Sequence, residues 1–114
     1  MAEGTDPIGE IHTYGMDVKK REIYIHGCHG SFETEDPGVD YRMASSTIKN
    51  LRFLDSLSNS PILVHMHSVG GNWNDGMAIY DSIKLSKSWI SILVYGQAES
   101  MSSIVLQAAD SRIM

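Results

Sequence analysis

Short strand-like runs alternate along this chain with stretches whose apolar residues recur at helical spacing, and this alternation restricts the fold most. Strands are predicted at residues 21–26, 62–67 and 89–95, and residues 112–114 resemble the start of a fourth. Residues 89–95 are nearly continuous in apolar character, as buried parallel strands are. Strands that alternate with helices predict an α/β fold with a parallel sheet and right-handed crossovers.

Three helices are predicted between these strands, at residues 43–57, about 75–87 and about 100–109. The first is expected to stop before Pro61, because proline disfavours helical geometry in the preceding residue. Asn74 or Asp75 is expected to cap the second helix.

The length of 114 residues, 42% of them hydrophobic, is enough for one small domain with one core. Residues 1–20 lack periodicity and are expected to form a flexible arm, followed by the domain proper in residues 21–114. The last predicted strand is cut off where the domain would still need covering. We therefore expect a fragment or a truncated product.

The net charge of -5 gives no reason to expect a nucleic acid or an anionic membrane as partner. The single Cys28 excludes a disulfide within the chain, which fits a reducing compartment. No apolar run approaches the roughly 20 residues of a membrane helix, and the first 17 residues lack the apolar core of a secretory signal. A cytoplasmic location is expected, with an organellar matrix or stroma, or the host cytoplasm for a viral protein, left open.

Two loops follow neighbouring predicted strands at their carboxyl ends, where parallel α/β folds gather their sites. One is residues 68–71, Ser-Val-Gly-Gly, and the other is residues 96–101, Gly-Gln-Ala-Glu-Ser-Met. Ser100 would lie in the first turn of a helix, whose N–H groups lack helical partners. The N–H groups of Met101 and Gly71 could then hold an oxyanion, and losing one such donor costs about 3–4 kcal/mol. A serine at this place is also an ordinary N-cap, and Gly-Gly turns after strands are common.

Three blocks of sequence, in order and at matching spacing, resemble the proteolytic subunit of Clp protease. They are residues 68–71, residues 76–81 (Gly-Met-Ala-Ile-Tyr-Asp) and residues 96–101, and the likeness extends over residues 21–114. The resemblance implies the ClpP/crotonase-like spiral of β-α-β units, truncated before its C-terminal part.

By position, the resemblance implies that Ser100 is the nucleophile and that Gly71 and Met101 supply the oxyanion-hole N–H groups. Gly70 and Asn72 would lie beside a bound peptide, which pairs as an added strand. The implied activity is that of a serine endopeptidase that degrades unfolded polypeptides. The implied assembly is a double ring of two heptamers, fed by an AAA+ unfoldase. No cofactor and no metal are expected, and the chain contains no Gly-x-x-x-x-Gly-Lys-Ser/Thr loop for a nucleotide.

Several positions depart from the family pattern. Val69 replaces a proline, Glu99 replaces a small residue beside the nucleophile, and Ser102 replaces a glycine. The family's catalytic His and Asp lie downstream of the serine, yet none of the five histidines here follows Ser100. Asp110 is a poor substitute for the orienting Asp. A serine needs an adjacent base, so these 114 residues alone are expected to be nearly inactive.

Other functions stay open at this point. The chain could be an inactive subunit of a Clp-type ring, or a crotonase-like protein that holds a thioester oxyanion. A protein similar to signal-peptide peptidase would use a lysine as its base, and no lysine follows Lys87. The ligand types His26, Cys28 and His29, with His65 and His67, could form a metal site between neighbouring strands, although they match no standard zinc spacing.

Overall fold

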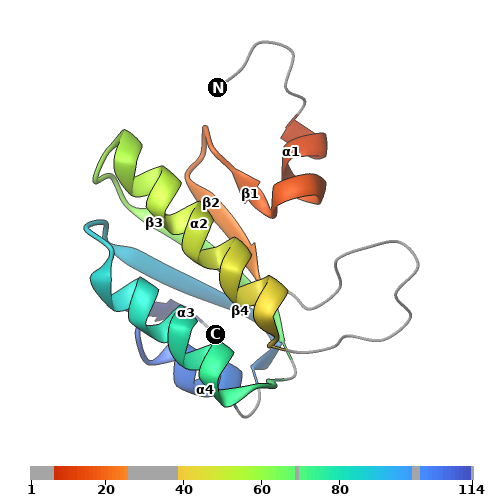
Figure 1. Cartoon of the computed structure of the whole chain (residues 1–114). Helices are drawn as coiled ribbons and strands as arrows, with labels where there is room; N and C mark the ends of the chain where they lie inside the picture. Colours follow the sequence, from red (N-terminus) through yellow and green to blue (C-terminus); the bar gives the residue numbers. More distant parts are fainter. Residues whose placement is uncertain (1–6, 26–38, 69, 99–100, 114) are drawn as a thin grey trace.

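The structure is a computed structural model that describes residues 7–25, 39–68, 70–98 and 101–113. Helices and strands alternate along it (Figure 1). In chain order they are α1 (Pro7–Tyr14), β1 (Met16–Asp17), β2 (Glu22–Ile25), α2 (Tyr41–Leu57), β3 (Ile62–Ser68), α3 (Trp73–Leu85), β4 (Ile90–Ala98), α4 (Met101–Leu106) and β5 (Ser111–Ile113).

The strands form one five-stranded sheet in the order β1-β2-β3-β4-β5. The pairs β2–β3, β3–β4 and β4–β5 are parallel, which confirms the predicted α/β fold with parallel strands. The short β1 adds an antiparallel edge to β2. Because each crossover moves one place in the same direction, right-handed connections put α2, α3 and α4 on one face of the sheet.

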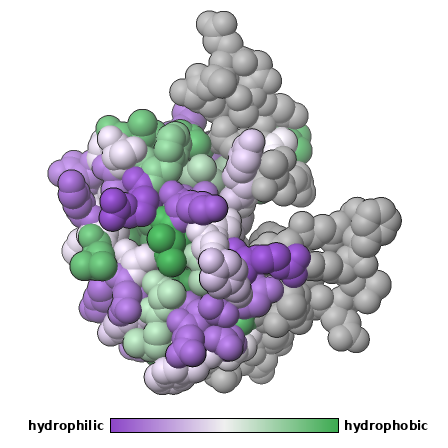
Figure 2. Space-filling model, viewed as in Figure 1, coloured by the Kyte–Doolittle hydropathy of each residue, from purple (hydrophilic) through white to green (hydrophobic). Residues whose placement is uncertain are grey.

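The core lies between that face and the helices. Alternate strand residues point into it, among them Ile23, Val64 and Ile92, which have no exposed surface. The helices contribute buried residues at helical spacing, such as Leu54 of α2 and Ile79 of α3. Figure 2 shows the molecule from the same side as Figure 1, with hydrophilic side chains spread among apolar ones. In the described part of the chain, no helix is both long and apolar enough to cross a membrane.

The N-cap of α3 differs from the prediction, and no N-cap was predicted for α2. Asp40 caps α2 by accepting a hydrogen bond from the Met43 N–H at 2.9 Å. Asn72 caps α3 by accepting one from the Asp75 N–H at 3.0 Å. The prediction of Asn74 or Asp75 as the cap is wrong, because both lie in the first turn of a helix that begins at Trp73. Either amide or carboxylate oxygen suits an N-cap, so residue type alone could not choose between adjacent positions.

Part of the expected N-terminal arm has regular structure, namely α1 and β1. Hydrogen bonds connect it to the domain: the Tyr24 N–H donates to the Gly15 carbonyl at 2.8 Å, and the Asn50 side chain donates to the Tyr14 carbonyl at 2.8 Å. Asn50 lies 36 residues from Tyr14, so no local pattern indicates that contact. Gly15 and Tyr24 flank the short antiparallel pair β1–β2, and two residues are too few for β1 to show a strand periodicity. Residues 1–6 lie outside the described residues.

Two other boundaries differ from the prediction at the C-terminal side of the sheet. β4 continues past residue 95, its expected end, to Ala98. α4 is shorter than expected, because hydrogen bonds from Gln107 to Ile104 and from Ala108 to Val105, both 3.0 Å, tighten the chain into three-residue turns after Leu106.

Candidate functional site

The two loops singled out by sequence leave neighbouring parallel strands at the same edge of the sheet. β3 and β4 pair regularly from Ile62↔Ile90 to Met66↔Val94, and after a register shift they pair again at Ser68↔Ala98. The expectation that these loops follow adjacent strands is confirmed. This carboxyl edge is where parallel sheets place their binding and catalytic groups.

A double-glycine turn shapes the first loop. Gly70 and Gly71 have φ angles of 91° and 152°, which side chains disfavour. Val39 forms a parallel bridge with Gly71: its N–H donates to the Gly70 carbonyl at 2.6 Å, and its carbonyl accepts from the Asn72 N–H at 2.8 Å. In such a bridge the flanking residues bond to Val39, so the N–H and C=O of Gly71 point to the other side. Gly71 is exposed and Gly70 is buried.

Most of the polar groups of Asn72 form hydrogen bonds within the protein. Its N–H donates to Val39, its carbonyl accepts from the Gly76 N–H at 2.9 Å, and its side-chain oxygen caps α3. Its side chain is exposed, and the amide NH₂ is the part left for contact with another molecule.

The second loop leads from β4 into α4. Met101 is the first residue of α4, so its N–H belongs to the turn whose donors have no helical acceptor. Ser100 and Glu99 lie outside the described residues, as does Val69 in the first loop. The roles of Ser100, Met101, Gly71, Gly70 and Asn72 therefore stay predictions.

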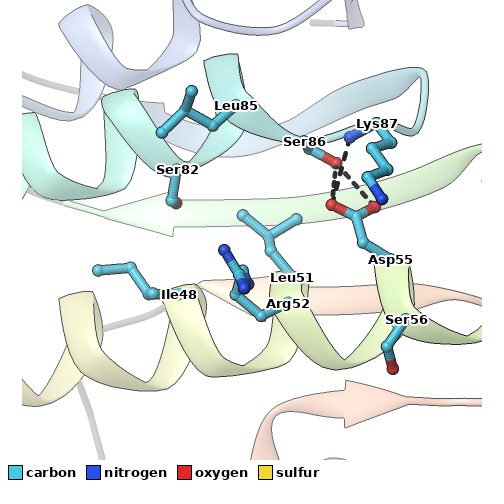
Figure 3. Close-up of a pocket in the computed structure, with 9 residues that line it drawn as sticks. All are labelled: Ile48, Leu51, Arg52, Asp55, Ser56, Ser82, Leu85, Ser86 and Lys87. Atoms are coloured by element: carbon cyan, nitrogen blue, oxygen red, sulfur yellow. Dashed lines mark hydrogen bonds between the residues drawn. The ribbon is translucent and has the colours of Figure 1, made fainter.

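A pocket of about 320 Å³ lies elsewhere, between the C-terminal halves of α2 and α3 (Figure 3). Asp55 lies at its rim and accepts hydrogen bonds from the hydroxyls of Ser86 and Ser88 at 2.8–2.9 Å and from the Lys87 N–H at 3.3 Å. These bonds fix the turn that precedes β4. The pocket is thus at the amino end of the strands, away from the two loops.

The histidine cluster does not form a metal site within the described residues, where no three His, Cys, Asp or Glu side chains lie close enough to share an ion. β2 and β3 are neighbours, as expected. His26, Cys28 and His29, however, lie outside the described residues. His65 is engaged by Glu22 and Tyr95.

The sequence did not predict this polar cluster, which consists of Glu22, His65 and Tyr95. His65 Nε2 lies 2.7 Å from Glu22 Oε1, and His65 Nδ1 lies 2.7 Å from the Tyr95 hydroxyl. Burial raises the pKa of the nearby Tyr24 hydroxyl, and the charge of Glu22 raises it further. The three members of the cluster stand on three adjacent strands, so only the strand register could have revealed it.

The chain is similar to known proteins over most of its length. The model of the Clp protease family matches residues 34–113. The ATP-dependent Clp protease proteolytic subunit of Carsonella ruddii is 35% identical over 98 residues, covering 86% of this chain and 45% of the relative. The ATP-dependent Clp protease proteolytic subunit 2 of Pseudomonas aeruginosa is 29% identical over 110 residues, covering 95% of this chain and 50% of the relative.

Solved structures agree with these relatives. ClpP1 from Listeria monocytogenes superposes with a TM-score of 0.71 at 27% identity, over 81% of this chain and 48% of that one. The ClpP catalytic domain from Plasmodium falciparum gives 0.69 at 29% identity, over 82% and 48%. The chain spans about half the length of the curated relatives it matches. The family model, the curated relatives and the fold all agree that this chain belongs to the Clp protease family.

Proposed function

We propose that the chain is part of a serine endopeptidase subunit that hydrolyses unfolded polypeptides. The observation that carries the proposal is that the double-glycine turn and the start of α4 follow two paired parallel strands at the same edge of the sheet. Membership of the Clp protease family supports it, since the curated relatives are named proteolytic subunits.

The proposed chemistry is acyl transfer through Ser100. Its hydroxyl attacks the scissile carbonyl while a general base takes the proton and later gives it to the leaving amine. Water then hydrolyses the acyl-serine ester. No histidine follows Ser100 in these 114 residues, so the base and its orienting carboxylate would come from residues outside them.

The oxyanion hole would combine the N–H groups of Gly71 and Met101. The Val39 bridge supports the first of these roles, because it uses the polar groups of Gly70 and Asn72 and leaves those of Gly71 facing the opposite side. The start of α4 supports the second, because the first N–H groups of a helix lack internal acceptors.

A substrate peptide would lie along the first loop beside Gly70 and Asn72. The backbone hydrogen bonds of an added strand do not depend on which side chains the peptide carries, and this suits unfolded polypeptides of varied sequence as substrates. The side-chain NH₂ group is the donor that Asn72 itself could offer to this peptide, since the other polar groups of this residue are bonded internally.

The assay for this function uses the full-length protein with casein as an unfolded substrate and a fluorogenic peptide. We expect slow casein cleavage by the protein alone and faster cleavage of a folded substrate once an AAA+ unfoldase and ATP are added. Peptide cleavage should need neither. A correctly folded full-length protein that cleaves neither casein nor the peptide contradicts the proposal and favours an inactive subunit.

The proposed assembly is a double ring of two heptamers, which would confine the sites and make substrate entry depend on the unfoldase. Light scattering of the full-length protein should report a particle with the mass of seven or fourteen subunits. A monomer at micromolar concentration contradicts the ring without touching the chemistry proposed for Ser100.

A further inference from the structure

The sheet carries a second set of polar side chains on the face opposite the helices. Glu22 of β2, His65 of β3 and Tyr95 of β4 alternate with core residues of their strands and therefore project from that other face. None of them belongs to the two loops at the carboxyl edge. Tyr95 is 47% exposed, so a reagent in solution can approach its side chain.

With Glu22 ionised and His65 neutral, one arrangement of protons satisfies both hydrogen bonds of the imidazole. An ionised Glu22 carboxylate can only accept, so His65 Nε2–H donates to Glu22 Oε1 across 2.7 Å. The neutral imidazole then has a lone pair on Nδ1, and the Tyr95 O–H donates to it across 2.7 Å. The carboxylate thus orients the imidazole and the imidazole accepts from the hydroxyl, within the distances that general-base catalysis requires.

Two tyrosine rings hold the imidazole in this orientation. Tyr24 stacks on His65 with the ring centroids 4.5 Å apart and the planes 7° apart. The Tyr95 ring also stacks with the His65 ring, with the centroids 5.6 Å apart and the planes 10° apart. The His65 side chain is 12% exposed and that of Glu22 is 22% exposed, so water screens the interaction between them only in part. The imidazolium that forms during proton transfer would be stabilised by Glu22.

We propose that Glu22, His65 and Tyr95 form a second nucleophilic site, in which Tyr95 accepts acyl groups from activated esters or thioesters. The Tyr95 oxygen attacks the acyl carbonyl, and His65 Nδ1 takes the hydroxyl proton. The tetrahedral intermediate then collapses, and the C–O or C–S bond to the leaving group breaks. The leaving group departs with the proton returned by His65, and a tyrosyl ester remains. The site is independent of Ser100 and of the proposed peptidase activity.

The test uses the full-length protein with Ser100→Ala, so that the serine contributes no acylation, and p-nitrophenyl acetate as the acyl donor. Peptide mapping follows acetylation of each tyrosine with time. We expect Tyr95 to react at least about tenfold faster than Tyr41, because a positioned general base contributes about 10²–10⁴-fold at full effect. Tyr41 is the internal reference, since it is 75% exposed and belongs to a helix outside the cluster.

Three variants separate activation from a merely structural role. Glu22→Gln keeps an acceptor for His65 but loses the charge, and we expect it to slow Tyr95 acetylation about tenfold. Tyr95→Phe keeps the ring stack and should remove the modification. Tyr24→Phe is the matched control: it deletes a hydroxyl 3.4 Å from Glu22 without touching a His65 nitrogen, and it should leave the rate nearly unchanged.

Two results would overturn the proposal. One is Tyr95 reacting no faster than Tyr41, and the other is Glu22→Gln reacting at the parent rate while the thermal midpoints of both proteins agree. Either result would make the cluster a stabilising contact between three strands. Neither would bear on Ser100, which is absent from every protein in the comparison.

Discussion

Replacing Ser100 by alanine is expected to lower peptide hydrolysis by the full-length protein by about 10³-fold or more, with the fold intact. The reason is that the acyl-enzyme can no longer form, and only binding and oxyanion stabilisation remain. The rate of fluorogenic peptide cleavage under saturating substrate measures the effect directly. Circular dichroism and the particle size by light scattering should match those of the parent protein.

The matched control for this variant is Ser103→Ala. Ser103 lies on the same short helix α4 and is exposed. Its replacement should leave peptide cleavage within about twofold of the parent rate, because Ser103 has no part in the proposed chemistry and surface substitutions usually change stability by no more than about 0.5 kcal/mol. Equal activity of the Ser100→Ala and Ser103→Ala variants would remove Ser100 from the mechanism.

Gly71→Ala is expected to destabilise the protein by about 2–5 kcal/mol, through both backbone strain and steric overlap. The φ of Gly71 is 152°, and a Cβ built there would lie 2.5 Å from the backbone nitrogen and from the backbone oxygen of Val39. Backbone atoms cannot rotate away as a side chain can, so the Val39 bridge would have to open. The urea midpoint of the full-length protein should fall accordingly.

Gly96→Ala provides the control for this second prediction. Gly96 also has a positive φ, 67°, but a Cβ there would meet no atom within 4 Å. Only the conformational strain of the left-handed region applies, so we expect a loss of about 1 kcal/mol. If the two variants unfold at the same urea concentration, the contact between Gly71 and Val39 is not part of the folded protein.

This result also bears on the choice of mutants for the oxyanion hole. Gly71→Ala would disturb the loop even if its N–H never met a substrate. A loss of activity in that variant would therefore identify the loop as necessary without showing that it binds the oxyanion. Ser100→Ala does not share this ambiguity, since it removes a single oxygen.

The central strands could be predicted from sequence because their signal is local. Residues 89–95 are almost uninterruptedly apolar, and β4 has alternate side chains in the core from Ile90 onward. The long helix α2 was predicted for the same reason, since Leu51 and Leu54 recur at helical spacing and both are buried. The spacing of apolar residues indicates which side chains are buried, and both β4 and α2 have a buried face, so both could be predicted.

The parts that were missed depend on partners far away in the chain. α1 and β1 look irregular by composition, but the Tyr14 carbonyl accepts a hydrogen bond from the side chain of the distant Asn50. Likewise Glu22, His65 and Tyr95 meet only because three strands pair in one register. No window of sequence contains these contacts. Of the candidate site, the loop positions followed from the β-α order, whereas the role of Ser100 rests on the resemblance and on the family.

The most direct test of the account is labelling of the full-length protein with a fluorophosphonate, followed by peptide mapping of the modified residue. This reagent reacts with a serine only where a base activates the hydroxyl and donors stabilise the oxyanion. The account predicts one label per chain, on Ser100, with no label on Ser102 or Ser103 and none in Ser100→Ala. A folded full-length protein that leaves Ser100 unlabelled would contradict the assignment of Ser100 as a nucleophile.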